Sequence, residues 1–235
     1  MIPARDRYQT AGADYGLDEG LRAHMLRIYN YMGIGLAVTG IVAMLVAATP
    51  ALYVPIFSTP LKWVVMLAPL GFVMFLSFRI ERISGTTAQL LFWLFCGLMG
   101  LSLASIFLVF TGASIGRAFF GAAAMFAAFS LYGYTTKRDL TQFGSFLMMG
   151  LIGVVIASVI NIFLGSSALQ FAISIIGILV FVGLTAWDTQ SIKLQYAEHH
   201  DGETRQKLAV MGALSLYLNF INIFQLLLSL TGERE

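Results

Sequence analysis

Seven long apolar runs divide this chain, and they constrain its fold more than any other feature. A helix needs roughly 17–25 apolar residues to cross a bilayer. We expect spans at residues 26–48, 61–78, 88–110, 115–134, 143–164, 169–187 and 208–230. Only 11% of residues are charged and 58% are hydrophobic, against about 25% and 45–50% in soluble domains. The sequence therefore predicts an all-α integral membrane protein with seven transmembrane helices in a lipid bilayer.

The segment before the first run is polar. Residues 1–24 contain three arginines and three glycines, Arg5, Arg7, Arg22, Gly12, Gly16 and Gly20. This segment has neither the order of a cleaved signal peptide nor helical periodicity. We expect a mobile cytoplasmic tail at 1–24, followed by a seven-helix domain at 25–235. Within the second run, Pro69 predicts a kink and a possible moving part.

The distribution of lysine and arginine predicts the orientation in the membrane. If the N-terminus is cytoplasmic, eleven of the 14 basic residues lie inside and three, Lys62, Arg117 and Arg234, lie outside. We therefore expect the N-terminus on the cytoplasmic side of the plasma membrane and the C-terminus on the outer side. The same orientation predicts a long cytoplasmic loop at 190–207. A net charge of +2 is too small to indicate a nucleic-acid partner.

One carboxylate, Asp188, lies at the edge of an apolar run. An ionisable side chain costs about 2.5–3.5 kcal/mol at the centre of a membrane helix, so each one is a functional candidate. Asp188 ends the sixth run, with Thr185 one turn earlier on the same helical face. Two interpretations are open: a carboxylate in an ion pathway, or an interfacial Asp that caps or hydrates the helix end.

The seventh run is the most polar. Residues at spacings of three and four share one helical face, and here they are Gly212, Ser215, Asn219, Asn222, Leu226 and Ser229. Such a face packs against helices rather than lipid, which predicts a central position for this span. The asparagines either serve helix packing or, in the case of Asn219, approach Asp188 on the cytoplasmic side of a closed pathway.

The sequence lacks the residues that membrane enzymes require. His24, His199 and His200 all lie outside the expected spans, so an intramembrane serine protease would have no base. Asp188 alone cannot form an aspartyl dyad. The seventh run has no lysine to carry retinal. We expect no enzyme activity and no cofactor.

Four parts of the chain share a pattern with one known family. They are MGLSL at 99–103 with TGASI at 111–115, YGYTTKRDL at 132–140, GLTAWDTQ at 183–190, and GALSLYLNFIN at 212–222. In this order they resemble the bacterial branch of the Bax inhibitor-1 family, over nearly the whole chain after the tail. The resemblance implies two three-helix layers around a central C-terminal helix. It also implies a pH-sensitive calcium leak channel, with calcium as the transported ion.

The same resemblance implies roles for particular residues. In the family, an aspartate on the sixth span and one on the seventh share a proton and gate the pore. Asp188 matches the first, whereas Asn219 stands at the second position. An arginine at the cytoplasmic end of the second span pairs with the first aspartate in the family, and Arg79 and Arg82 both fit. The expected gating set is Asp188, Asn219, Arg79, Arg82, Thr185 and Asn222, with Asp188 as the calcium ligand.

Two other functions stay open at this point. Some bacterial members resemble modulators of a membrane-bound ATP-dependent protease, which would make this protein a non-transporting regulator with that protease as partner. A proton-coupled transporter of a small metabolite is less favoured, because a single intramembrane carboxylate offers little coupling.

Overall fold

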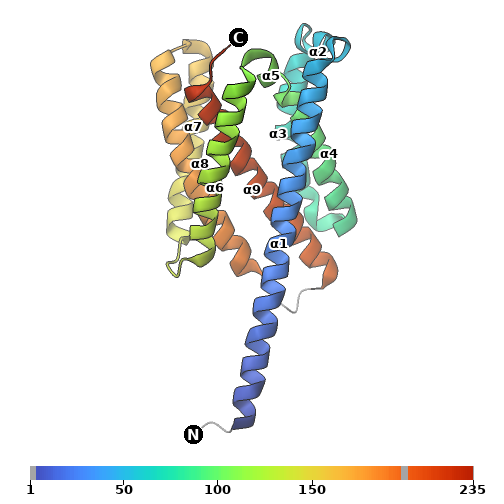
Figure 1. Cartoon of the computed structure of the whole chain (residues 1–235), viewed down its shortest axis with the longest axis vertical. Helices are drawn as coiled ribbons and strands as arrows, with labels where there is room; N and C mark the ends of the chain where they lie inside the picture. Colours follow the sequence, from blue (N-terminus) through green and yellow to red (C-terminus); the bar gives the residue numbers. More distant parts are fainter. Residues whose placement is uncertain (1–3, 197–200, 235) are drawn as a thin grey trace.

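The chain forms a bundle of long helices (Figure 1). The computed structural model describes residues 4–196 and 201–234. Within these ranges seven helices are long and apolar enough to cross a membrane, which confirms the predicted all-α fold. The helices are α1 (Ala4–Ala48), α2 (Pro50–Phe57), α3 (Leu61–Arg79), η1 (Ile80–Arg82), α4 (Gly85–Leu103), α5 (Ile106–Val109), α6 (Gly112–Thr135), α7 (Thr141–Leu164), α8 (Ser167–Gln195) and α9 (Gly202–Thr231).

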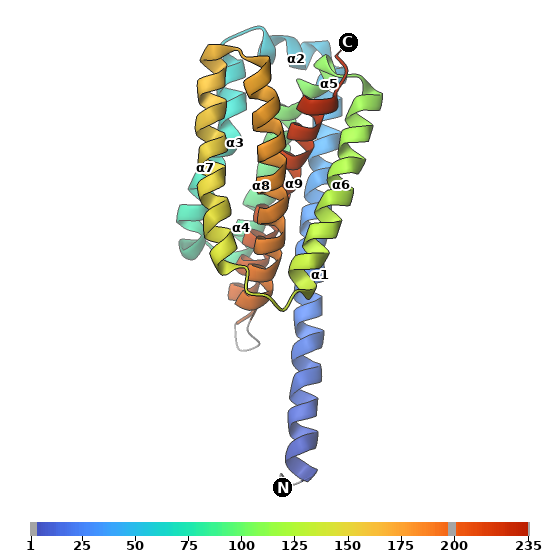
Figure 2. The same cartoon turned by 90° about the vertical axis from the view of Figure 1, so that its left-hand side faces the viewer.

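Helix α9 lies at the centre of the bundle. It packs against α1 and α4 on one side and against α6 and α8 on the other, while α3 packs on α4 and α7 packs on α8. Figure 1 shows α9 between these two groups of helices, and Figure 2 shows it between α8 and α6. In both α8 and α9, 56% of the most apolar stretch is buried, against 17% in α3 and in α7. Helix α9 is therefore central, as its polar face predicts; of that face Gly212 and Asn219 are buried, and Ser215 and Asn222 are half-buried.

The two ends of the bundle differ in charge. One end, which we call the basic end, holds the N-terminal part of α1, the connections α3–α4 and α6–α7, and the start of α9 (Figure 1). Most lysines and arginines lie there, including Arg79, Arg82, Lys137 and Arg138. The C-terminus lies at the opposite end, as seven crossings require. That the basic end faces the cytoplasm stays a prediction.

Three helices extend beyond the apolar runs that predicted them. Helix α1 begins at Ala4, so most of the segment 1–24, for which we expected no regular helix, is helical. Helix α8 continues to Gln195 and α9 begins at Gly202. The expected loop at 190–207 is thus largely helical, and Asp188 lies about two turns inside α8 rather than at its end. Asp201 caps α9 by accepting a hydrogen bond from the Thr204 N–H at 2.8 Å.

Glycines let two helices approach α8 beside Asp188. A Cβ on Gly133 of α6 would overlap the backbone carbonyl of Ala186, and one on Gly144 of α7 would overlap the Trp187 ring. Small residues allow such close helix contacts in membranes. The turn of α8 that precedes Asp188 is therefore held from two sides.

The contact between Gly133 and Ala186 predicts a stability effect. Gly133→Ala should destabilise the bundle by about 1–3 kcal/mol, because the new methyl group meets rigid backbone and forces α6 away from α8. Thermal unfolding of the protein in detergent measures this. Gly153→Ala is the matched control, because a Cβ there meets no atom within 4 Å, and it should leave the unfolding temperature unchanged or raise it.

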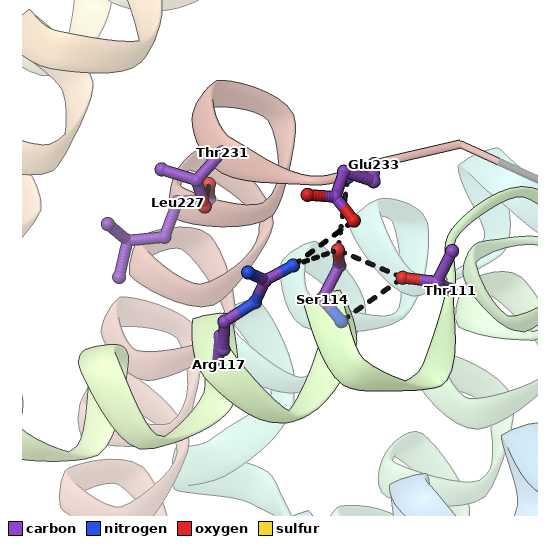
Figure 3. Close-up of polar contacts among 6 residues, drawn as sticks. All are labelled: Thr111, Ser114, Arg117, Leu227, Thr231 and Glu233. Atoms are coloured by element: carbon purple, nitrogen blue, oxygen red, sulfur yellow. Dashed lines mark hydrogen bonds and ion pairs between the residues drawn. The ribbon is translucent and has the colours of Figure 1, made fainter.

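A short strap after α9 ties the end of that helix to the start of α6 at the opposite end of the bundle (Figure 3). The Thr111 N–H donates to the Glu233 carbonyl at 3.1 Å, and the Glu233 N–H donates to Ser114 Oγ at 3.1 Å. The Glu233 carboxylate pairs with Arg117 at 3.4 Å. Arg234 lies over the Phe110 ring, 5.8 Å from its centre. Backbone and side-chain contacts together fix α9 at this end.

Candidate functional site

Asp188 of α8 contacts the polar face of α9 directly. Its Oδ2 accepts hydrogen bonds from Ser215 Oγ at 2.7 Å and from Asn219 Nδ2 at 2.6 Å. Asn219 is buried, whereas Asp188 and Ser215 are half-buried. Hydrogen bonds to a charged acceptor are about twice as strong as neutral ones. The carboxylate therefore joins the two most buried helices of the bundle.

Two cavities meet at this contact. The larger, which we call the α3–α7 cavity, has a volume of about 620 Å³ and lies against α3, α4, α7, α8 and α9. The smaller, which we call the basic-end cavity, has about 210 Å³ and extends from Asp188 past Gln195 and Leu208 toward the basic end. Three residues line both cavities: Trp187, Asp188 and Ser215. They form the wall between the two spaces.

The α3–α7 cavity is apolar with a polar strip along α9. Asn219, Asn222 and Gln225 line it on that side, and Ser102 of α4 also lines it. The Asn222 amide donates to the Leu218 carbonyl of its own helix at 2.7 Å. Pro69, where the sequence predicts a kink, lies inside α3 and lines the same cavity. Polar atoms thus continue from Asp188 into the membrane-spanning part of the bundle.

The residues that follow Asp188 fix the rotation of α8. Thr189 Oγ1 lies 3.0 Å from Ser130 Oγ of α6. The Gln190 side chain bridges the α6–α7 connection, because its Oε1 accepts from the Leu140 N–H and its Nε2 donates to the Arg138 carbonyl, both at 2.8 Å. Lys193 donates to the Tyr134 carbonyl at 2.9 Å. These contacts keep Asp188 turned toward α9.

The structure brings some of the predicted site residues together and leaves others apart. Asp188 and Asn219 are in contact, and Asn222 lines the cavity beside them. The buried Thr185 hydroxyl donates to the Phe181 carbonyl at 2.8 Å and lines neither cavity. Arg79 and Arg82 are exposed at the basic end. Within the described ranges, ion pairs join Arg117 to Glu233 and Lys207 to Glu203, and neither predicted arginine pairs with Asp188.

The oxygen atoms around Asp188 suit a hard cation, but they offer a single charge. Ca²⁺ takes oxygen ligands, six to eight of them, and binds more tightly as carboxylates are added. In the part of the chain that the structure describes, no cluster of three or more His, Cys, Asp or Glu side chains could hold a metal ion. Asp188 with Ser215 and Asn219 would thus favour transient rather than tight calcium binding.

The sequence analysis did not identify two residues that belong to the site, Ser215 and Gln190. Ser215 was placed on the polar face of α9 but not recognised as a second donor to Asp188. The spacing of four between Ser215 and Asn219 was the available signal, because it places both on one face within reach of one carboxylate. Gln190 sits two residues after Asp188, and its contacts with the α6–α7 connection leave no pattern in the sequence.

Comparisons with known proteins place this arrangement in a family. The family described as inhibitor of apoptosis-promoting Bax1 matches residues 21–235. An uncharacterised protein of Rickettsia prowazekii is 47% identical over 100% of both chains. The inner membrane protein YbhL of Escherichia coli K12 is 42% identical over 98% of this chain and 100% of its own. An uncharacterised membrane protein of Streptococcus pyogenes is 33% identical over 93% of this chain and 96% of its own.

The family match covers all seven spans from residue 21 onward and includes both partners of the Asp188–Asn219 contact. The relatives match over nearly their whole lengths, so the likeness extends well beyond one motif. This chain belongs to the Bax inhibitor-1 family of membrane proteins.

Proposed function

We propose that the protein is a pH-sensitive calcium leak channel of the bacterial inner membrane, gated by protonation of Asp188. The observation that carries the proposal is the position of this carboxylate in the wall between two cavities. The similarity to the Escherichia coli inner membrane protein YbhL supports the inner-membrane location. The excess of lysine and arginine at the basic end supports a cytoplasmic position for that end.

The gate follows from the chemistry of the two hydrogen bonds. While Asp188 is ionised, Ser215 and Asn219 donate to the same oxygen and hold α8 against α9. A proton on Asp188 removes the charge that strengthens both bonds. Separation of α9 from α8 would then join the basic-end cavity to the α3–α7 cavity. Calcium would pass along the polar strip formed by Asn219, Asn222 and Gln225.

A flux assay with purified protein tests this proposal. Protein reconstituted in liposomes should release or admit calcium more slowly at neutral pH than at acidic pH, with protein-free liposomes as the control. Flux that is absent at every pH would contradict the channel and favour a non-transporting regulator. Flux that does not change with pH would contradict the gate alone.

Ser215→Ala should raise the calcium flux at neutral pH. The variant lacks one of two hydrogen bonds to a charged acceptor, each worth about 1.5–3 kcal/mol, so the open fraction should rise by about tenfold or more. The same assay measures it. Ser191→Ala is the matched control, because Ser191 lines the basic-end cavity but is not a partner of Asp188. Equal flux in both variants would mean that Ser215 does not hold the gate.

A further inference from the structure

A groove between α1 and α6 lies outside the ion pathway described above. Its volume is about 500 Å³, within the range of roughly 300–1,000 Å³ typical of ligand pockets. Helices α1 and α6 both pack against α9 but make few contacts with each other, so the seam between them is open. Met25 and Leu26 of α1 line the groove, with Phe126, Ala127 and Leu131 of α6.

The groove is apolar along its length because its polar groups bond to each other. Tyr29 Oη lies 2.6 Å from Ser130 Oγ, and Ser130 Oγ lies 3.0 Å from Thr189 Oγ1. These hydroxyls bond within the protein and so require no polar ligand. The groove therefore suits a hydrocarbon chain.

The groove is apolar in its body and basic at its mouth, which matches the acyl chain and the charged headgroup of a phospholipid. Its body lies inside the spans Glu19–Ala48 and Gly112–Thr135, at the depth of acyl chains. Arg22 and Tyr134 line its basic-end mouth, each within about one turn of the end of its span. An exposed arginine at this depth attracts anionic headgroups, and a tyrosine is favoured at the same level.

We propose that the groove between α1 and α6 binds an anionic phospholipid, with an acyl chain against Ala127 and Leu131 and the headgroup phosphate on Arg22. The charge at the mouth and the apolar body at bilayer depth select this occupant. This lipid site does not depend on calcium transport, so its test is independent of the test of the proposed channel.

Native mass spectrometry of the full-length protein in detergent tests the site. Phosphatidylglycerol and phosphatidylethanolamine with identical acyl chains serve as the probes. The wild type should prefer phosphatidylglycerol by about fivefold, the contribution of one basic side chain near a membrane surface. Arg22→Gln should abolish this preference. Arg27→Gln is the matched control, because Arg27 is an exposed α1 arginine that does not line the groove, and it should keep the preference.

A second variant tests the body of the groove. Ala127 is exposed in the groove wall, so Ala127→Phe should fill the space without disturbing the core and weaken binding of both lipids. A preference that survives Arg22→Gln, or lipid binding that is unchanged in Ala127→Phe, would overturn the proposal. A dimer in lipid-free samples that Ala127→Phe dissociates would also overturn it, because a second copy would then occupy the groove.

Discussion

Asp188→Asn should flatten the dependence of calcium flux on pH. The amide keeps the shape of the side chain but, like protonated Asp188, lacks the charge that strengthens the hydrogen bonds from Ser215 and Asn219. An amide does not gain or lose a proton in the assay range, so the gate loses its titratable group. Calcium should also bind more weakly, since hard cations prefer charged oxygen ligands. Liposome flux across pH, together with a calcium-binding isotherm, measures both effects.

Asp139→Asn is the control for this variant. Asp139 lies in the α6–α7 connection at the basic end, and hydrogen bonds from Thr141 hold the pKa of its carboxyl below its usual range. Within the described part of the chain it forms no hydrogen bond with Asp188, Ser215 or Asn219 and lines neither cavity, so its replacement should preserve the wild-type curve. If the flux–pH curve of Asp188→Asn follows that of the wild type, Asp188 is not the group that gates the channel.

Asn219→Asp should move the flux midpoint to higher pH, steepen the curve and tighten calcium binding. Asn219 donates to Asp188 at 2.6 Å, so the substitution replaces a stabilising donor with a second carboxylate. Two carboxylates at this distance repel each other and titrate in coupled steps. The closed contact, which needs a charged acceptor and neutral donors, is then lost at a less acidic pH. A calcium ion would meet up to two negative charges instead of one.

Asn222→Asp is the matched variant for this experiment. Asn222 lies one turn along the same face of α9, and its amide bonds to the Leu218 carbonyl rather than to Asp188. A carboxylate there should leave the steepness of the wild-type flux curve unchanged, because Asp188 then still titrates alone. If Asn219→Asp leaves the midpoint, the slope and the calcium affinity unchanged, Asn219 serves helix packing and takes no part in gating.

The positions of the spans could be predicted from sequence because the bilayer requires long apolar runs. The helix ends could not, because a helix that has already formed continues through polar residues at little cost. Gln190 and Gln195 extend α8 in this way, beyond the point where hydropathy ends the span. Asp188 consequently lies deeper in its helix than the apolar run indicated.

The site could be predicted only in part. The spacing of Ser215 and Asn219 defined a face of α9, but the distance from that face to Asp188 depends on the register between α8 and α9. That register is set by contacts such as Gly177 of α8 against Leu226 of α9, which leave no signal in either helix alone. The sequence likewise places Arg79 and Arg82 at one end of the second span without fixing the direction of either side chain.

The strap at Glu233 holds the C-terminal end of α9 against α6, so α9 would tilt about that end during opening. Ser215 lies 16 residues before Thr231, a lever of about 24 Å at 1.5 Å per residue. A tilt of about 5° around the strap would carry Ser215 roughly 2 Å from Asp188, which is enough to break a hydrogen bond, while the strap itself stays closed. The separation between α8 and α9 would then be largest at the basic end and smallest at the strap.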